Sequence, residues 1–370
     1  MAKDKLPQDS KYPGIYDFHV HIGETIAGHE LADNWHSFAR LYEHCGLEGI
    51  GVFVTEAEDE GIAHKLRRMR TAAKDYPGKV FWHLSPKSIE AENIIPLLAD
   101  DVDIKLYTTY RYAGLYQSYE AIERMMRDLA SHKPRILVHC EDDDIVSEYD
   151  YRYPLQRAAD HCLRRPEKAE IIAVEKLLEL SLKHKYPLHI VHVSCPKAAL
   201  LIQEAKKEAS YITCETAPHY LLLNEDNLGG PQGHRWLCSP PLRSESSRGA
   251  MVELLQDGVF DIIATDHCAF PTAVKDVGIL HPSQTPMGIA GSGALFTLLA
   301  EHLVAKGKLE MDKLFRLISY NPAKLMGWGK PEHHYHLERL GAPVPVQASY
   351  SDTPNPWMDF WSHYELRRSQ

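Results

Sequence analysis

The 370-residue sequence predicts the α/β fold class and, within it, a (β/α)8 (TIM) barrel. A short apolar segment, a polar turn and an amphipathic segment follow one another eight times along the chain. Several apolar segments, such as Arg135-Ile136-Leu137-Val138-His139, are nearly continuous, which is typical of parallel strands buried on both faces. A chain of this length can bury one large core of this kind.

The predicted strands and helices follow in chain order. The strands are residues 15–21, 49–55, 79–84, 102–106, 135–139, 188–193, 211–214 and 260–265. Helices are expected over 58–74, 119–132, 166–183 and 196–209, among others. In the second of these, Ile122, Met125, Met126 and Leu129 recur at steps of three and four residues, as on one face of a helix.

We expect three parts: an N-terminal extension (1–14), the barrel (15–329) and a tail rich in proline and aromatic residues (330–370). The tail shows no periodic strand pattern, and no strands are expected after Lys324. Its cluster of residues 333–336 (His-His-Tyr-His) is expected on the surface rather than in a metal site. Trp357, Phe360, Trp361 and Tyr364 have helical spacing and are expected to pack on the barrel or on another subunit.

Composition is that of a soluble globular protein, and the cytoplasm is the expected compartment. The formal net charge is −10 without a basic block, which argues against nucleic acid and anionic membranes as partners. No stretch approaches the roughly 20 apolar residues of a membrane span, and the polar residues 1–11 are not a signal peptide. The seven cysteines form no Cys-x-x-Cys pair, which suits a reducing compartment.

Polar residues with metal-binding chemistry end five of the predicted strands. His19 and His21 alternate with apolar residues, so both point to the same face of the first strand. The other strand-end residues are Lys105 (fourth strand), His139 (fifth), His189 and His192 (sixth) and Asp266 (eighth). In a barrel the carboxyl ends of all strands meet at one mouth, which brings these residues together.

This order of residues resembles the binuclear metal-dependent amidohydrolases, and within them the cyclic amidohydrolase branch. That branch contains hydantoinases, dihydropyrimidinases, allantoinases and dihydroorotases. The similarity covers about residues 15–328. Its motifs lie at 104–110, 138–142, 190–195, 217–223, 238–244, 264–268 and 321–324.

The resemblance implies two divalent metal ions, most commonly Zn²⁺. His19 and His21 would bind the more buried ion, and His139 and His192 the more exposed one. Lys105 would be carbamylated and bridge both ions. Asp266 would bind the first ion and act as general base, while a metal-bridging hydroxide attacks the ring carbonyl.

His192 is preferred to His189 because it aligns with the family ligand. The two lie three residues apart and should therefore face opposite sides of the strand. For His219 and His267 two alternatives remain open: a role beside the ligands or substrate, or core packing with a backbone hydrogen bond.

The resemblance also bears on the ring that is opened. Tyr110, five residues after Lys105, matches the tyrosine with which hydantoinases and dihydropyrimidinases stabilise an oxyanion. Ser239 matches a position whose backbone binds the imide ring. Gly23 stands where dihydroorotases usually carry an arginine, which argues against dihydroorotate. Met287 replaces an expected asparagine, and we expect the chain to lack the small β-sandwich domain of such relatives.

We therefore expect a zinc-dependent hydrolase that opens a hydantoin- or dihydropyrimidine-like ring. The alternatives are a dihydroorotase- or allantoinase-like enzyme, a divergent amidohydrolase that acts on a lactone or acyclic amide, and, last, a non-catalytic scaffold. Because relatives are commonly dimers or tetramers, a homo-oligomer is expected.

Overall fold

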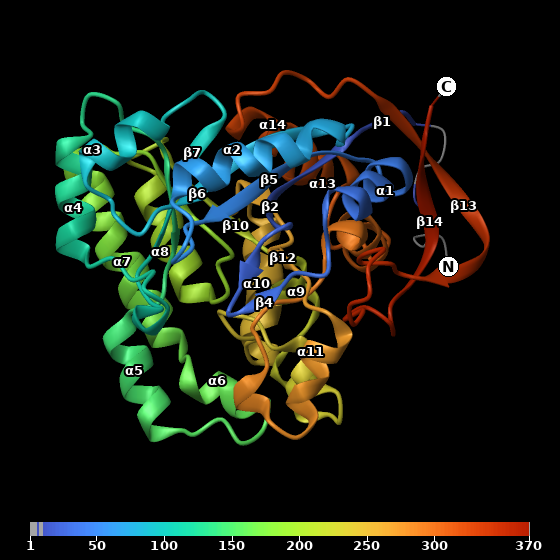
Figure 1. Cartoon of the computed structure of the whole chain (residues 1–370). Coiled ribbons are helices and arrows are strands. Elements are labelled where there is room, and N and C mark those ends of the chain that lie inside the picture. The colour runs from blue at the N-terminus through green and yellow to red at the C-terminus, as the bar shows by residue number, and fades with distance from the viewer. Residues whose placement is uncertain (1–5, 7–9, 370) are drawn as a thin grey trace.

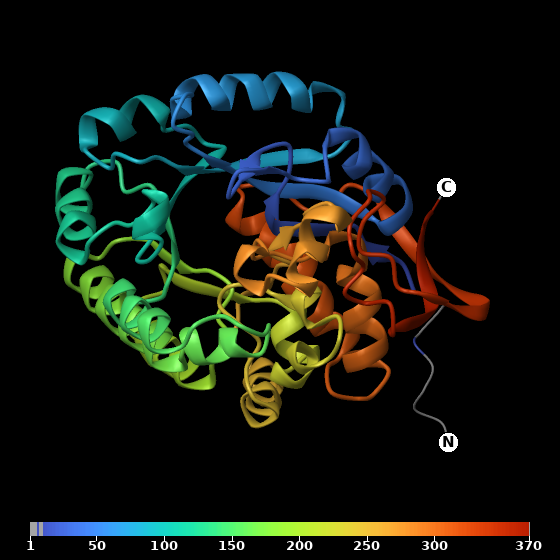
Figure 2. The same cartoon turned by 60° about the horizontal axis from the view of Figure 1, so that its bottom comes forward.

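The computed structural model describes residue 6 and residues 10–369, in which one parallel sheet curls into a barrel (Figures 1 and 2). The strand order is β11-β10-β9-β8-β7-β6-β5-β2-β12, and all neighbours pair in parallel. These strands are β2 (Ile15–His21), β5 (Leu47–Thr55), β6 (Lys79–Ser85), β7 (Val102–Tyr107), β8 (Ile136–His139), β9 (Leu188–Ile190), β10 (Ile212–Thr216), β11 (Ile262–Ile263) and β12 (His267–Cys268).

The last two strand segments close the ring. β11 pairs with β10 and β12 pairs with β2, and only three residues separate the two segments. They are two pieces of one eighth strand, so the (β/α)8 prediction is confirmed. The strand is interrupted at Asp266, whose φ of +52° lies in the left-handed region. The prediction of a continuous strand over 260–265 is therefore wrong in its boundaries.

Helices surround the sheet, as Figure 2 shows. The helices of this outer layer are α1 (Trp35–Cys45), α2 (Ile62–Ala72), α3 (Ala91–Ile94), α4 (Tyr119–Asp128), α7 (Glu167–His184), α8 (Pro196–Lys206), α10 (Glu245–Gln256), α12 (Leu295–Leu299), α13 (Met311–Phe315) and α14 (Asn321–Leu325). α4 buries Ile122, Met125 and Met126 as its periodicity predicts, and Ser118 caps its first turn by accepting from Ala121 N. Within the described residues, no helix is long and apolar enough to cross a membrane.

The barrel interior is apolar at one end and polar at the other. Tyr16, Phe18, Phe53 and Phe81 form the interior cluster, against which residues of the last barrel helices, such as Met326, pack. The other end carries long loops with α5 (Asp143–Arg152), α6 (Asp160–Arg164), α9 (Pro218–Leu222), α11 (Thr272–Asp276) and the hairpin of β3 (Thr25–Ile26) and β4 (His29–Glu30). Of these, α5, α6 and α11 gather at the lower end of the molecule in Figure 1. Side chains at the carboxyl ends of the strands therefore emerge among these loops.

The tail contains two strands, so the prediction that none follows Lys324 is wrong. β13 (His334–Pro345) and β14 (Trp361–Arg368) form an antiparallel pair, to which β1 (Tyr12–Pro13) adds. Burial alternates along β13: Tyr335 and Leu337 are buried and their histidine neighbours exposed. This is the period of a strand with one covered face, which the polar composition of the segment conceals. In the described part of the chain, no further sheet packs on this one.

The tail packs on the barrel through Trp357, Phe360 and Tyr364, as expected, but the prediction is wrong for Trp361, which is 47% exposed. Trp357 is buried, and its Nε1 donates to the backbone oxygen of Ala290 at 3.1 Å. Tyr364 is buried in the main core. Helical spacing was misleading here, since residues 361–368 form a strand.

Candidate active site

Five candidate ligands lie next to one another at the polar end of the barrel. His19 Nε2 is 3.0 Å and His21 Nε2 3.8 Å from Oδ1 of Asp266. Ligand atoms of these three residues all lie within 4.8 Å of one another, an arrangement that can hold a metal ion. The strain at Asp266 turns its carboxylate toward the first strand, and backbone strain of this kind is typical of functional sites.

His139 and His192 form the second candidate pair. Nδ1 of His139 lies 3.0 Å from Nε2 of His192. Two nitrogens bound to one tetrahedral zinc ion at about 2.0–2.1 Å are roughly 3.3 Å apart, so this spacing fits two ligands of a shared ion. The rings of His19 and His192 have centroids 5.4 Å apart, which places the two pairs side by side.

The sixth strand differs from the prediction. β9 ends at Ile190, and His192 has a φ of +38°. As a result His189 and His192 both contact Glu215: Nε2 of His189 lies 3.2 Å from Oε2, and the backbone N of His192 donates to Oε1 at 3.3 Å. The expectation that they face opposite sides assumes a regular strand as far as His192, and the strand ends two residues before it.

Carboxylates lie behind three of the four imidazoles. Glu215 Oε1 is 2.5 Å from Nδ1 of His19, and Glu24 Oε1 is 3.3 Å from Nδ1 of His21. Glu141 Oε2 is 2.7 Å from Nε2 of His139. Carboxylates in this position fix the ring tautomer and orientation of metal-binding histidines. The geometry thus leaves Nε2 of His19 and His21 and Nδ1 of His139 for the ligand role.

The charge state of the site also suits a metal. Burial lowers the pKa of His19 and His192 well below the usual range, so both are neutral, as ligands must be. Burial raises the pKa of Glu215 well above its usual value. Within the described residues, Nδ1 of His192 has no hydrogen-bond partner. Carboxylates and neutral imidazoles together form a donor set whose negative charge divalent ions would offset.

Lys105 on β7 completes the group. It is buried, and its Nζ lies 4.9 Å from the ring centroid of Phe53. The same ring stacks near His19, at a centroid distance of 4.2 Å. Burial lowers the Lys105 pKa to about 8, against the opposing effect of Asp266 and Glu215. A lysine with this pKa has a neutral amine fraction at pH 7–8, the form that reacts with carbon dioxide.

The predicted substrate residues fall into two groups. Tyr110 lies beside His139, with ring centroids 5.0 Å apart, and its hydroxyl forms a hydrogen bond with Ser239. Met287 is partly buried and packs in the cluster that contains Cys238 and Ala290. Tyr110 and Ser239 are therefore neighbours, and Met287 packs in the cluster that contains Cys238, the residue before Ser239.

The two remaining histidines differ. His267 uses both ring nitrogens within the fold: Nε2 donates to Asp33 at 2.9 Å, and Nδ1 accepts from the backbone N of Gly291 and of Ser292. His219 is buried, and burial lowers its pKa to about 4. Its Nε2 has no partner among the described residues, which leaves this atom available to a ligand.

Five residues of the site region were not predicted: Glu24, Glu141, Asp143, Arg165 and Glu215. Of these, only Glu215 could have been found from the sequence pattern. It lies at the carboxyl end of the seventh strand, the position that the predicted ligands occupy on their own strands. Arg165 is buried and ion-paired with Glu141, which also contacts His139. Buried Arg243 is paired in the same way with Glu170, at 3.0 Å.

A family model described as the amidohydrolase family matches residues 11–331. The chain therefore belongs to the amidohydrolase family. Members of this family are generally dependent on two metal ions, and the cluster of His19, His21 and Asp266 is consistent with that property.

Curated relatives include dihydroorotases and an allantoinase. A dihydroorotase of Brevibacillus brevis is 32% identical over 240 residues, 64% of this chain and 54% of that protein. An allantoinase of Bacillus velezensis is 28% identical over 340 residues, 88% of this chain and 73% of that protein. The aligned part of the chain spans about half the length of dihydroorotases such as this one.

Solved structures agree in fold. The crystal structure of a dihydropyrimidinase from Brevibacillus agri has a TM-score of 0.88 at 22% identity, covering 96% of this chain and 82% of that one. An L-hydantoinase from Arthrobacter aurescens has a TM-score of 0.85 at 20% identity, with 96% and 83% covered.

Proposed function

We propose that this protein is a metal-dependent hydrolase that opens a cyclic amide or imide ring of the hydantoin or dihydropyrimidine type. The observation that carries the proposal is the pair of adjacent histidine sites, three of whose imidazoles are backed by carboxylates, with Asp266 facing the first pair. This is a donor set for two divalent ions, and zinc suits its nitrogen-rich composition. Names of the relatives and neighbours support the substrate class.

The residues would share the ions as follows. His19, His21 and Asp266 would hold the more buried ion, His139 and His192 the more exposed one, and carbamylated Lys105 would bridge both. When bound, such ions lower the pKa of water and polarise a carbonyl oxygen. Lys105 is buried against the Phe53 ring, which also lies beside His19, and it has the neutral amine fraction that carbamylation requires. Reconstitution with and without bicarbonate tests this role, since activity should depend on bicarbonate only if Lys105 is carbamylated.

The chain's own residues perform the proton transfers. Oδ1 of Asp266, 3.0 Å from His19, accepts a proton from the attacking water and later delivers it to the leaving ring nitrogen. The Tyr110 hydroxyl, whose pKa is raised by burial, stays protonated and donates to the oxygen that becomes negative. Ser239, hydrogen-bonded to Tyr110, would bind the polar edge of the ring.

The charges of the mouth favour an uncharged ring. Gly23 offers no cation, and the buried guanidinium groups of Arg165 and Arg243 are engaged by Glu141 and Glu170. A ring carboxylate would have to compete with these ion pairs. The names of the B. brevis and similar relatives favour dihydroorotate as the second candidate.

The deciding experiment measures ring opening by the zinc-loaded protein on dihydrouracil, hydantoin, 5-substituted hydantoins, allantoin, succinimide and dihydroorotate. Turnover of uncharged rings above that of dihydroorotate supports the proposal. Preference for dihydroorotate would contradict the proposed hydantoin- or dihydropyrimidine-type substrate but would leave the family assignment unchanged. A protein with two bound metals that opens none of these rings would contradict the substrate class. We further propose that the protein is a homo-oligomer and that it lies in the cytoplasm. Sedimentation at several protein concentrations tests the oligomeric state.

A further inference from the structure

Tyr110 has a backbone conformation that its neighbours must enforce. Its φ of +66° lies in the left-handed region, which a tyrosine rarely occupies. The residue follows β7 and precedes the short helical turn Arg111–Ala113. Conformations of this kind persist where the surrounding structure fixes them, and they cluster at functional sites.

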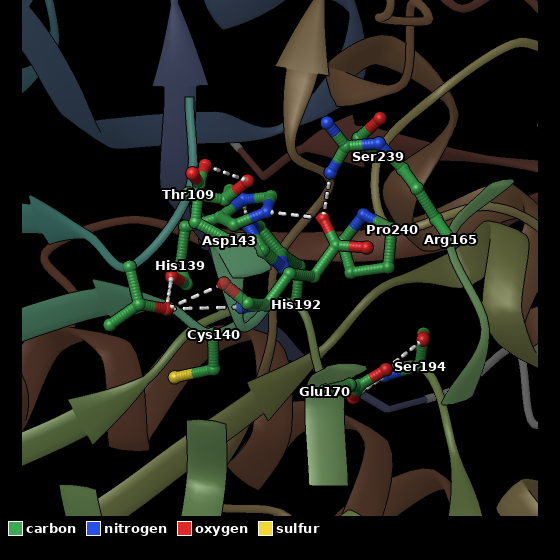
Figure 3. A network of polar contacts seen from close by, with 12 residues as sticks. Thr109, His139, Cys140, Asp143, Arg165, Glu170, His192, Ser194, Ser239 and Pro240 are labelled. Carbon is green, nitrogen blue, oxygen red and sulfur yellow. Dashed lines mark hydrogen bonds and ion pairs between the residues drawn. The ribbon is translucent and has the colours of Figure 1, made fainter. Parts of the chain in front are cut away.

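Asp143 holds the chain on both sides of Tyr110. Its Oδ1 accepts from Oγ1 of Thr109 at 3.2 Å and from the backbone N of Arg111 at 3.3 Å. Its Oδ2 is ion-paired with Nε of Arg111 at 3.2 Å. Asp143 is itself buried and anchored, because its backbone N donates to the backbone oxygen of Thr108 at 3.1 Å. Figure 3 shows the contact between Thr109 and Asp143 close to His139.

A second group fixes the tyrosine ring. The guanidinium of buried Arg165 lies 4.9 Å from the centroid of Tyr110, within the range of a cation–π contact. Arg165 is paired with Glu141, and Glu141 contacts Nε2 of His139. The ring of Tyr110 is therefore positioned relative to a candidate metal ligand, while Asp143 fixes its backbone.

We propose that Asp143 is a positioning residue for Tyr110. One buried carboxylate holds residues 109–111 in the strained conformation, and this aims the phenol at the reacting carbonyl oxygen. The inference rests on the proposed function, in which the hydroxyl of Tyr110 stabilises the oxyanion. Because an oxyanion contact forms in the transition state, loss of Asp143 should lower kcat and leave KM nearly unchanged.

A double-mutant cycle separates this role from general support of α5. Tyr110→Phe should lower kcat roughly 10²- to 10³-fold, the range for removal of one oxyanion donor. Asp143→Ala should lower kcat about 10- to 100-fold, because the hydroxyl is misplaced but present. The double variant should be no slower than Tyr110→Phe alone, within about threefold, since a misplaced phenylalanine loses nothing more.

Two further variants and two physical measurements complete the test. Asp143→Asn keeps an acceptor oxygen for Thr109 and Arg111 and should recover most of the activity lost in Asp143→Ala. Asp144→Ala is the matched control: it removes the neighbouring exposed carboxylate, which also pairs with Arg111 at 3.2 Å, and should leave kcat unchanged. Metal content should equal that of the wild type. Crystals of Asp143→Ala should show Tyr110 relaxed to negative φ.

The possible outcomes separate a failure of the inference about Asp143 from a failure of the proposed function. If Asp143→Ala slows the Tyr110→Phe variant by the same factor as the wild type, Asp143 is a general structural residue and the inference fails. If Tyr110→Phe alone leaves ring opening unchanged, the oxyanion role of Tyr110 fails, and the inference fails with it. If Asp143→Ala crystals keep φ near +66°, the backbone is fixed by other groups and the inference is again overturned.

Discussion

The outer nitrogens of the first histidine pair are each in contact with a buried glutamate. Glu215 contacts His19, and Glu24 contacts His21 and accepts from Nζ of Lys65 at 3.0 Å. A carboxylate at this place makes the imidazole a better donor to a metal and stops ring rotation. The affinity of the site is therefore set partly by residues that touch no metal.

Replacement of Glu215 tests this point. Glu215→Gln keeps the shape of the side chain and removes its charge, so we expect metal affinity to fall roughly 10- to 100-fold. Competition with a chromogenic chelator measures the change. Glu338→Gln, on the exposed side of β13, is the control and should bind metal as the wild type does. Equal affinities for all three proteins would contradict the role of Glu215.

Asp266 is the second residue whose role is open to direct measurement. Asp266→Asn retains an oxygen ligand but cannot accept the proton, so kcat should fall at least about 10²-fold, the lower end for loss of a general base. Metal analysis of the same sample should still find metal in the site. Unchanged turnover would show that another group acts as the base.

Among the elements, the loop after β2 and the tail are joined through a single carboxylate. Asp33 accepts from Nε2 of His267 at 2.9 Å and from the hydroxyls of Ser349 and Ser351. Burial alone would raise the pKa of Asp33, but these hydrogen bonds outweigh it and lower the value to about 2. The charged carboxylate is thus part of what holds the C-terminal segment on the barrel.

The lowered pKa predicts how stability changes with pH. The folded pKa of about 2 lies below the usual value of 3.8, so the stabilisation is fully present above about pH 4 and is lost as the pH falls toward 2. The free energy of unfolding of the wild type should exceed that of Asp33→Asn at pH 6, and the difference should shrink by about 1 kcal/mol at pH 3. Denaturant unfolding at the two pH values measures it. A difference that does not change with pH would contradict the assignment.

The elements also show what the sequence could and could not predict. Strand-end residues such as His139 and Asp266 could be placed, because parallel strands bring their carboxyl ends to one mouth. Glu24 and Glu141 could not, since they lie in loops whose path depends on packing. The strand pair of the tail could not be predicted, because His334 and His336 occupy the exposed positions of β13 and give the segment the composition of a polar loop. The sequence does not indicate the interruption at Asp266, because an aspartate can also occupy a regular strand conformation.

For the whole molecule, metal should stabilise the fold. The candidate ligands come from β2, β7, β8, the segment after β9 and the junction of β11 and β12, so bound ions would link five of the eight barrel strands. Ions that bind only the folded state raise its stability. Removal of metal with a chelator should therefore lower the unfolding temperature, and added zinc should restore it. An unchanged unfolding temperature in a protein shown to have lost its metal would contradict a site that joins these strands.

The interrupted eighth strand sets the order of events when the protein is made. His19 and His21 leave the ribosome early, whereas Asp266 follows after almost the whole barrel has been synthesised. Until that residue has emerged and β12 has paired with β2, the more buried ion lacks its full ligand set. We expect a nascent chain that stops before Asp266 to bind metal weakly, so that loading of the buried ion marks the completion of the barrel during synthesis.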